Sequence, residues 1–107
     1  MDADSFFENY ITLESRWKDF VSKEITNSNS SALGMTALRI CHYVVKHPSC
    51  ALKEVAISLD ISLGSASQMV QSMADNGLLK CAANRDDRRR ISISPLPVLI
   101  NFFAKLL

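Results

Sequence analysis

Four arginines fall within six positions of the segment 84–90, and these residues are the best suited to binding chemistry. DNA carries a dense array of negative phosphates and releases counterions when cations bind to it. Arginines in a short loop can therefore contact phosphates or enter a minor groove. The alternative interpretation is a solvated charged loop with no such role. The arginines are Arg85, Arg88, Arg89 and Arg90.

The segment 62–76 is polar on one side and contains neither lysine nor arginine. Glutamine can bind adenine with two hydrogen bonds, and serine can bond to bases or phosphates. We expect this side to contact DNA, although its members could equally be ordinary surface residues. Binding strength would then depend on the arginine loop, Arg39 and Lys53. The expected contact residues of the segment are Ser62, Gly64, Ser65, Ser67, Gln68 and Gln71.

Other reactive side chains do not form a catalytic or metal-binding pattern. The three cysteines are widely spaced and predict neither a disulfide framework nor a zinc site. Cys41 lies on an apolar helix face, whereas Cys50 is expected in a loop, where it could be reactive although only Lys53 would lower its pKa. His42 and His47 have no acid or cysteine at ligand spacing. We therefore expect a protein that is not an enzyme and has no cofactor and no metal.

Length and charge restrict the class of protein further. The 107 residues are enough for one domain and too few for two independent cores. Residues 1–31 hold six acids and three bases, whereas residues 32–107 hold nine bases and five acids. The apolar runs are shorter than the about 20 residues of a membrane span, and the acidic start is unlike a signal peptide. We expect a soluble, cytoplasmic protein of bacterial type, associated with the nucleoid and without a membrane partner.

Positions 4–26 are predicted to form one long amphipathic helix. Apolar residues recur there at steps of three and four, which lays a continuous stripe along a helix. The stripe is broader than a small body can cover, so we expect a second copy of the chain to cover it. The alternative is that the stripe packs only on its own domain. The expected dimer residues of this helix are Phe6, Phe7, Tyr10, Leu13, Trp17 and Phe20.

Three shorter helices are predicted in the next part of the chain. Thr36 would cap a helix over 37–46, which Pro48 stops at or just before His47. A second helix is expected over 52–59 and, after a tight turn at 60–62, a third over 63–76. Ser62 would cap that third helix, and Gly77 would supply the left-handed residue at its end. Positions 27–31 are expected to form a linker.

The chain then changes from helical to strand periodicity. Positions 78–81 and 91–94 are predicted as two short strands around the charged loop 82–90, and 98–107 as a final apolar helix. The fold class is therefore mainly α with a small β-hairpin, a winged helix-turn-helix. We expect a single domain over 1–107, with a dimerisation helix and linker at 1–31, the winged helix at 32–94 and a C-terminal helix at 95–107.

Five short motifs resemble the MarR type (multiple antibiotic resistance regulator) of winged helix-turn-helix regulators. They are LGMT at 33–36, LKEVA at 52–56, LDIS at 59–62, GLL at 77–79 and DDRRR at 86–90. The resemblance covers about 33–94, and its most specific parts are the last two motifs. It implies a wing in which an arginine enters the minor groove and an aspartate two residues earlier orients it. Two registers fit, Asp86 with Arg88 or Asp87 with Arg89, and we prefer the second.

The resemblance also implies a homodimer built from N- and C-terminal helices, a palindromic double-stranded operator and a small-molecule effector. The C-terminal dimer residues would be Ile100, Phe103 and Leu107. The sequence departs from the pattern in its single C-terminal helix, in Ser94-Pro95 after the second strand, and in its uncharged recognition helix. This last departure predicts weak DNA binding that depends strongly on salt.

The sequence therefore predicts a DNA-binding transcriptional regulator, in the simplest case a repressor that blocks polymerase. The helix over 62–76 would enter the major groove, and the wing over 82–90 would lie on the flanking minor groove or phosphates. One alternative is a winged helix that binds protein, such as an accessory subunit or anti-regulator with little DNA binding of its own. Another is an accessory domain of a larger enzyme.

Overall fold

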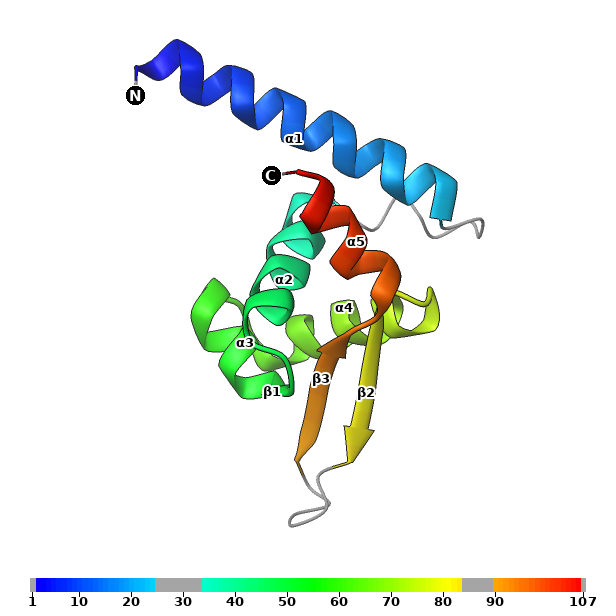
Figure 1. Ribbon diagram of the computed structural model, residues 1–107. Helices are drawn as coiled ribbons and strands as arrows, with labels where there is room; N and C mark the ends of the chain where they lie inside the picture. Colours follow the sequence, from blue (N-terminus) through cyan, green and yellow to red (C-terminus); the bar gives the residue numbers. More distant parts are fainter. Residues whose placement is uncertain (1, 25–33, 84–89, 107) are drawn as a thin grey trace. The chain divides into compact units, whose positions relative to one another are not determined.

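The computed structural model describes residues 2–24, 34–83 and 90–106. The chain divides into two compact units, Met1–Met35 and Thr36–Leu107. The first unit consists mainly of one helix, and the second contains the remaining helices and a small sheet (Figure 1). Among the described residues, no helix combines the length and apolar character that crossing a membrane requires.

The first unit contains helix α1 (Ala3–Glu24), close to the helix predicted at 4–26. Asp2 caps its start, because the Asp2 carboxylate accepts a hydrogen bond from the Ser5 N–H at 2.7 Å. Trp17 and Val21 are its buried residues, and the Trp17 ring stacks on Phe20 at 5.6 Å. Positions 25–31, including the predicted linker, lie outside the described residues.

The second unit begins with α2 (Met35–Lys46), whose buried face includes Leu38, Cys41 and Val44 as predicted. The helix ends before Pro48, also as predicted. It begins two residues earlier than expected, however, so Thr36 lies inside the helix and its prediction as the N-cap is wrong. A threonine cap is worth only about 1 kcal/mol, which is too little to fix a helix start by itself.

The helices α3 (Leu52–Leu59) and α4 (Leu63–Asp75) follow and confirm the predicted helix-turn-helix. Each helix has one apolar side, and burial of that side in the core holds the helix in its place in the fold. A tripeptide turn joins them, and α4 contacts both α3 and the strand that follows it. The buried residues are Val55, Ala56 and Leu59 on α3 and Ala66, Val70 and Met73 on α4.

A three-stranded antiparallel sheet has the order β1-β3-β2. The hairpin strands β2 (Leu79–Ala83) and β3 (Ile91–Pro95) are the two predicted strands, with β2 shifted by one residue at its start and two at its end. Strand β1 (Cys50–Ala51) was not predicted, because two residues cannot display the alternation that marks a strand. It pairs with β3, and Ile93 lies opposite both Cys50 and Cys81.

The last element is α5 (Pro97–Lys105), within two residues of the predicted helix at either end. Pro97 occupies its first turn, where a missing N–H costs nothing. The α5 residue Phe103 contacts His42 of α2 with ring centroids 5.7 Å apart. Figure 1 shows the β2–β3 hairpin extending away from α5, so the second unit has a helical end and a hairpin end.

These elements confirm the predicted fold class, mainly α with a small β-hairpin in a winged helix-turn-helix. The core is entirely apolar among the described residues. Within it, the Cys41 thiol lies 3.3 Å from the Met73 sulfur, linking α2 to α4. Burial raises the pKa of Cys41 to about 12, so this thiol stays neutral and behaves as a small apolar group.

Two isoleucines on β3 provide a matched test of this core. Ile93 is fully buried, whereas Ile91 is 46% exposed. We expect Ile93→Ala to lower the free energy of unfolding by about 2–5 kcal/mol, because it leaves a cavity between strands and helices. Ile91→Ala should change it by only about 0.5 kcal/mol. Urea denaturation measures both, and equal losses would contradict the burial described here.

Candidate nucleic-acid interface

A tight turn sets the start of α4 relative to α3. Asp60 adopts a left-handed conformation (φ 55°), which short polar side chains tolerate. The Ile61 N–H donates to the Ala56 carbonyl at 3.0 Å, closing the end of α3. Ser62 then caps α4, because its hydroxyl accepts a hydrogen bond from the Ser65 N–H at 3.0 Å. The predicted turn and the predicted Ser62 cap are both confirmed.

The C-terminal end of α4 is also capped by a local hydrogen bond. Gly77 has φ 78°, a left-handed conformation that glycine adopts without strain, as predicted. The Leu78 N–H donates to the Met73 carbonyl at 3.0 Å across this glycine. Helix α4 is therefore stopped at both ends by local hydrogen bonds, at Ser62 and at Gly77.

The outer side of α4 is exposed and mostly polar, as predicted. Ser62, Gly64, Ser65, Ser67, Gln68 and Gln71 are all exposed to solvent. The two glutamines differ, because the Gln71 amide donates to the Asp75 carboxylate at 2.9 Å. The side chain of Gln68 makes no hydrogen bond to the part of the chain that the structure describes. Gln68 is thus the amide available to bind another molecule, a distinction that the sequence did not reveal.

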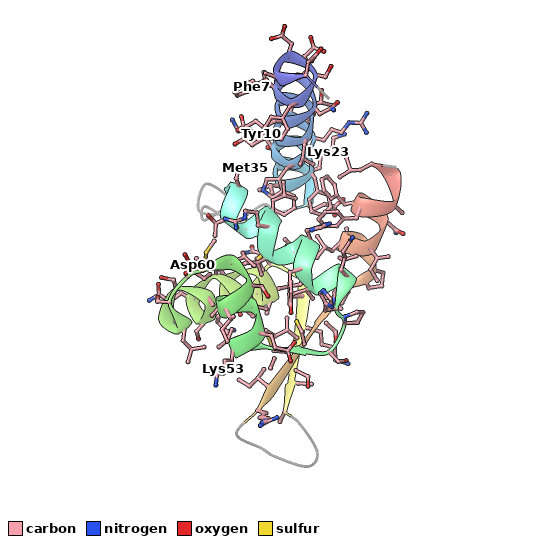
Figure 2. All side chains as sticks on the ribbon, turned by 90° about the vertical axis from the view of Figure 1, so that its left-hand side faces the viewer. Phe7, Tyr10, Lys23, Met35, Lys53 and Asp60 are labelled. Atoms are coloured by element: carbon pink, nitrogen blue, oxygen red, sulfur yellow. The ribbon has the colours of Figure 1, made fainter. Side chains whose placement is uncertain are left out.

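The helix-turn-helix carries little positive charge. Between residues 52 and 75 there is one base, Lys53, and three acids. Lys53 is exposed and points outward from α3 (Figure 2). Arg39 of α2 is also exposed. Glu54 and Asp60 are exposed on the same two-helix unit. The cations that would attract a polyanion must therefore come mainly from the hairpin.

The four arginines lie in the sequence between the two strands of the hairpin. Strands β2 and β3 bring Ala83 opposite Ile91, and Arg90 is exposed just before β3. The tip residues 84–89 lie outside the described residues. The contacts predicted for Arg85, Asp87, Arg88 and Arg89, and the choice between the two aspartate–arginine registers, therefore remain predictions.

Two exposed apolar residues near the turn were not among the predicted contacts. Ile57 of α3 is 69% exposed and Leu63, the first residue of α4, is 55% exposed. Ile57 departs from the three- and four-residue spacing of the buried side of α3, and this departure was the available signal. Exposed apolar side chains beside a polar helix can contact thymine methyl groups or another protein.

The predicted dimer residues differ in exposure. Phe6, Phe7 and Tyr10 are exposed, and Phe7 and Tyr10 project from the same side of α1 (Figure 2). Leu13 and Phe20 are half-buried and Trp17 is buried. On α5, Ile100 is 44% exposed and Phe103 is half-buried, whereas Leu107 lies outside the described residues.

Cys50 does not lie in a loop as predicted. It forms part of β1 and is buried, with its thiol 3.8 Å from the Ile93 carbonyl. Burial and the nearby Glu54 carboxylate raise the pKa of Cys50, which disfavours the reactive thiolate. The expected loop position of Cys50 is therefore wrong, and its burial disfavours the reactivity that the sequence left open. No cluster of three metal-ligating residues occurs within residues 2–24, 34–83 and 90–106.

A capped helix-turn-helix followed by a hairpin defines a winged helix-turn-helix protein. Here a long helix precedes it and a further helix follows the hairpin, and the chain shares this fold with solved MarR structures. A structure of the MarR protein from Peptoclostridium difficile matches with a TM-score of 0.66 and 11% identity, covering 99% of this chain and 67% of that one. No family model and no curated protein matches the sequence.

Two further structures have the same fold. One is an S. aureus MepR–DNA complex, with a TM-score of 0.68 and 14% identity over 97% of this chain and 82% of that chain. The other is the PcaV transcriptional regulator from Streptomyces coelicolor with its natural ligand, with a TM-score of 0.61 and 16% identity over 91% of this chain. This chain spans 63% of the PcaV chain. At these identities the likeness establishes the fold.

The three cysteines should differ in their reaction with iodoacetamide. Cys81 is exposed, although burial of part of its side chain and Asp75 raise its pKa, so we expect it to react slowly. Cys41 and Cys50 should react only after unfolding, because both are buried and have raised pKa values. Mass spectrometry of native and denatured samples measures this order. Native labelling of Cys50 as fast as that of Cys81 would contradict it.

Proposed function

We propose that this chain is a sequence-specific, double-stranded DNA-binding transcriptional regulator that acts as a homodimer and, in its simplest mode, as a repressor. Helix α4 enters the major groove, and the wing at 82–90 contacts the flanking minor groove or phosphates. The observation that carries the proposal is the exposed, hydrogen-bonding side of α4, held in a capped helix-turn-helix whose hairpin leads into four arginines.

In this proposal, base discrimination and binding strength come from different elements. Gln68 offers an amide that can bind the adenine edge with two hydrogen bonds. The serines of α4 are short enough to bond to bases or phosphates without displacing the helix. The wing arginines supply the counterion release that an α3–α4 unit with one base and three acids cannot supply. Arg39 and Lys53 add exposed positive charge.

A homodimer would place two α4 helices about one DNA turn apart, which fits a palindromic operator. The exposed Phe6, Phe7 and Tyr10 support dimerisation, because aromatic residues gathered on one helix favour association. The solved structures of MepR with DNA and of PcaV with its natural ligand have the same fold, which supports binding of DNA and of a ligand. In this proposal a small-molecule effector would change the spacing of the two DNA-binding bodies. The proposed location of the protein is the cytoplasm of a bacterial-type cell.

The second candidate is a winged helix that binds protein. It is favoured by the exposed Ile57 and Leu63 beside the turn and by the absence of lysine and arginine from 62–76. A gel shift with random DNA and with DNA from the gene's own promoter separates the two. No shift at low salt would favour the protein-binding candidate and contradict the first.

DNA affinity should fall steeply with ionic strength. For about six phosphate contacts per dimer, binding should weaken about 10³-fold between roughly 50 and 200 mM salt. Fluorescence anisotropy with labelled promoter DNA measures the slope. An affinity that hardly changes over this range would show that the wing arginines do not carry the binding.

Single substitutions should separate affinity from base preference. Arg89→Ala should weaken binding to every sequence, whereas the control Lys105→Ala on α5 should not. Gln68→Ala should reduce discrimination by about 1–3 kcal/mol at one base pair. The matched change Gln71→Ala should have a smaller effect, because that amide is already bonded to Asp75. Competition binding with single-base operator variants measures this. Equal, sequence-independent losses from Gln68→Ala and Arg89→Ala would remove the role assigned to Gln68.

A further inference from the structure

An evenly spaced strip of three residues along α1 carries opposite charges at its two ends. The strip consists of Asp4, Ile11 and Lys18. Each is seven residues, or about two helical turns, from the next, so the three lie on the same side of the helix. Phe7 lies between the first two. Phe7 and Ile11 are each 60% exposed, and the Lys18 side chain is 72% exposed. The strip therefore has an uncovered apolar middle, an acidic end and a basic end.

The charges of the whole helix are distributed in the same way, with acids near the start of α1 and bases near its end. Residues 2–14 contain four acids and no base, whereas residues 15–24 contain three bases and two acids. Asp2 is held ionised at the acidic end, because its hydrogen bonds with Ser5 lower its pKa. At the other end Lys18 pairs with Glu14 at 3.3 Å, and Arg16 and Lys23 add positive charge.

This polarity distinguishes the two ways in which a second α1 could cover the apolar middle. A parallel pair places Asp4 beside the partner's Asp4 and Lys18 beside the partner's Lys18, so both ends repel. An antiparallel pair centred on Ile11 places Asp4 beside the partner's Lys18 at both ends, because seven residues separate each from Ile11. The helix dipoles also oppose one another favourably in this orientation.

We propose that α1 pairs antiparallel with α1 of a second copy of this chain, with Ile11 at the twofold axis and Asp4 next to the partner's Lys18. The proposal rests on the homodimer in the proposed function and adds its orientation and register. The contact is isologous, so each charge pair occurs twice and the pairing closes at two chains.

Cysteine cross-linking tests the register directly. In a Cys81→Ser background, chains carrying Asp4→Cys are mixed with differently tagged chains carrying Lys18→Cys and oxidised. We expect the mixed disulfide and little disulfide between two Asp4→Cys chains, because a disulfide needs Cα atoms within about 7 Å. Arg16→Cys is the matched control. It lies two residues from Lys18 but on the opposite side of the helix, so it should not cross-link to Asp4→Cys.

A charge exchange tests the orientation without a cross-link. Asp4→Lys should weaken dimerisation about tenfold at low salt, because two attractive contacts become repulsive. Adding Lys18→Asp to that variant should restore it. In a parallel pair Asp4→Lys would leave the number of like-charge contacts unchanged. Sedimentation equilibrium measures the dissociation constants, and circular dichroism checks that α1 remains helical.

The outcomes separate this inference from the function on which it rests. Wild-type chains that remain monomeric in sedimentation would overturn the homodimer itself. A dimer that binds DNA but cross-links Asp4→Cys to itself, or is insensitive to the charge exchange, would overturn only the antiparallel α1 pair. The mixed disulfide together with restoration by the double exchange supports the proposal.

Discussion

The fold depends on one strand, β3, being paired on both edges. Its hydrogen bonds to β1 fix the start of α3, and its hydrogen bonds to β2 fix the chain that leaves α4. The helix-turn-helix is thereby tied at both of its ends to the same strand, with the fully buried Ile93 at the crossing point. A further hydrogen bond, from the Ser49 N–H to the Ser94 hydroxyl at 3.2 Å, extends this connection before β1 begins. The angle between α4 and the hairpin follows from this pairing.

Because the pairing of β3 holds the helix-turn-helix at both ends, the outer side of α4 is not needed to hold the fold together. The helix is held by Ala66, Val70 and Met73 on its buried side and by hydrogen bonds at Ser62 and Gly77 at its ends. No residue of the polar side between these caps is needed to keep the helix in place. The polar side can therefore be specialised for a ligand, and its lack of charge is compatible with a stable domain.

Much of this architecture could be predicted from the sequence because the signals are local. Apolar spacing marked the helices, a serine before α4 marked its cap, and Gly77 marked its end. Strand β1 could not be predicted, because its two residues owe their conformation to Ile93 and Ser92, more than 40 positions away. The burial of Cys50 follows from the same distant pairing, so the sequence placed this residue wrongly in a loop.

The candidate interface was predictable to a similar degree. Exposure of Ser65, Ser67, Gln68 and Gln71 follows directly from helical periodicity. The difference between Gln68 and Gln71 does not, because it depends on a side-chain hydrogen bond to Asp75. In the sequence, the exposure of Ile57 appears only as a departure from the apolar spacing of α3. The sequence alone does not distinguish such a departure from a helix whose apolar spacing is irregular.

The uncharged α4 has a consequence for control in a living cell. Under the proposed function, hydrogen bonds between amides and base edges do not change with the ion atmosphere, whereas the contribution of the arginine loop does. A change in cytosolic ions or in competing polyamines would alter how long the regulator stays on any site. The ratio of the affinity for the regulator's own site to the affinity for other sites would stay nearly constant. The residence time on DNA and the sequence selectivity could therefore evolve independently.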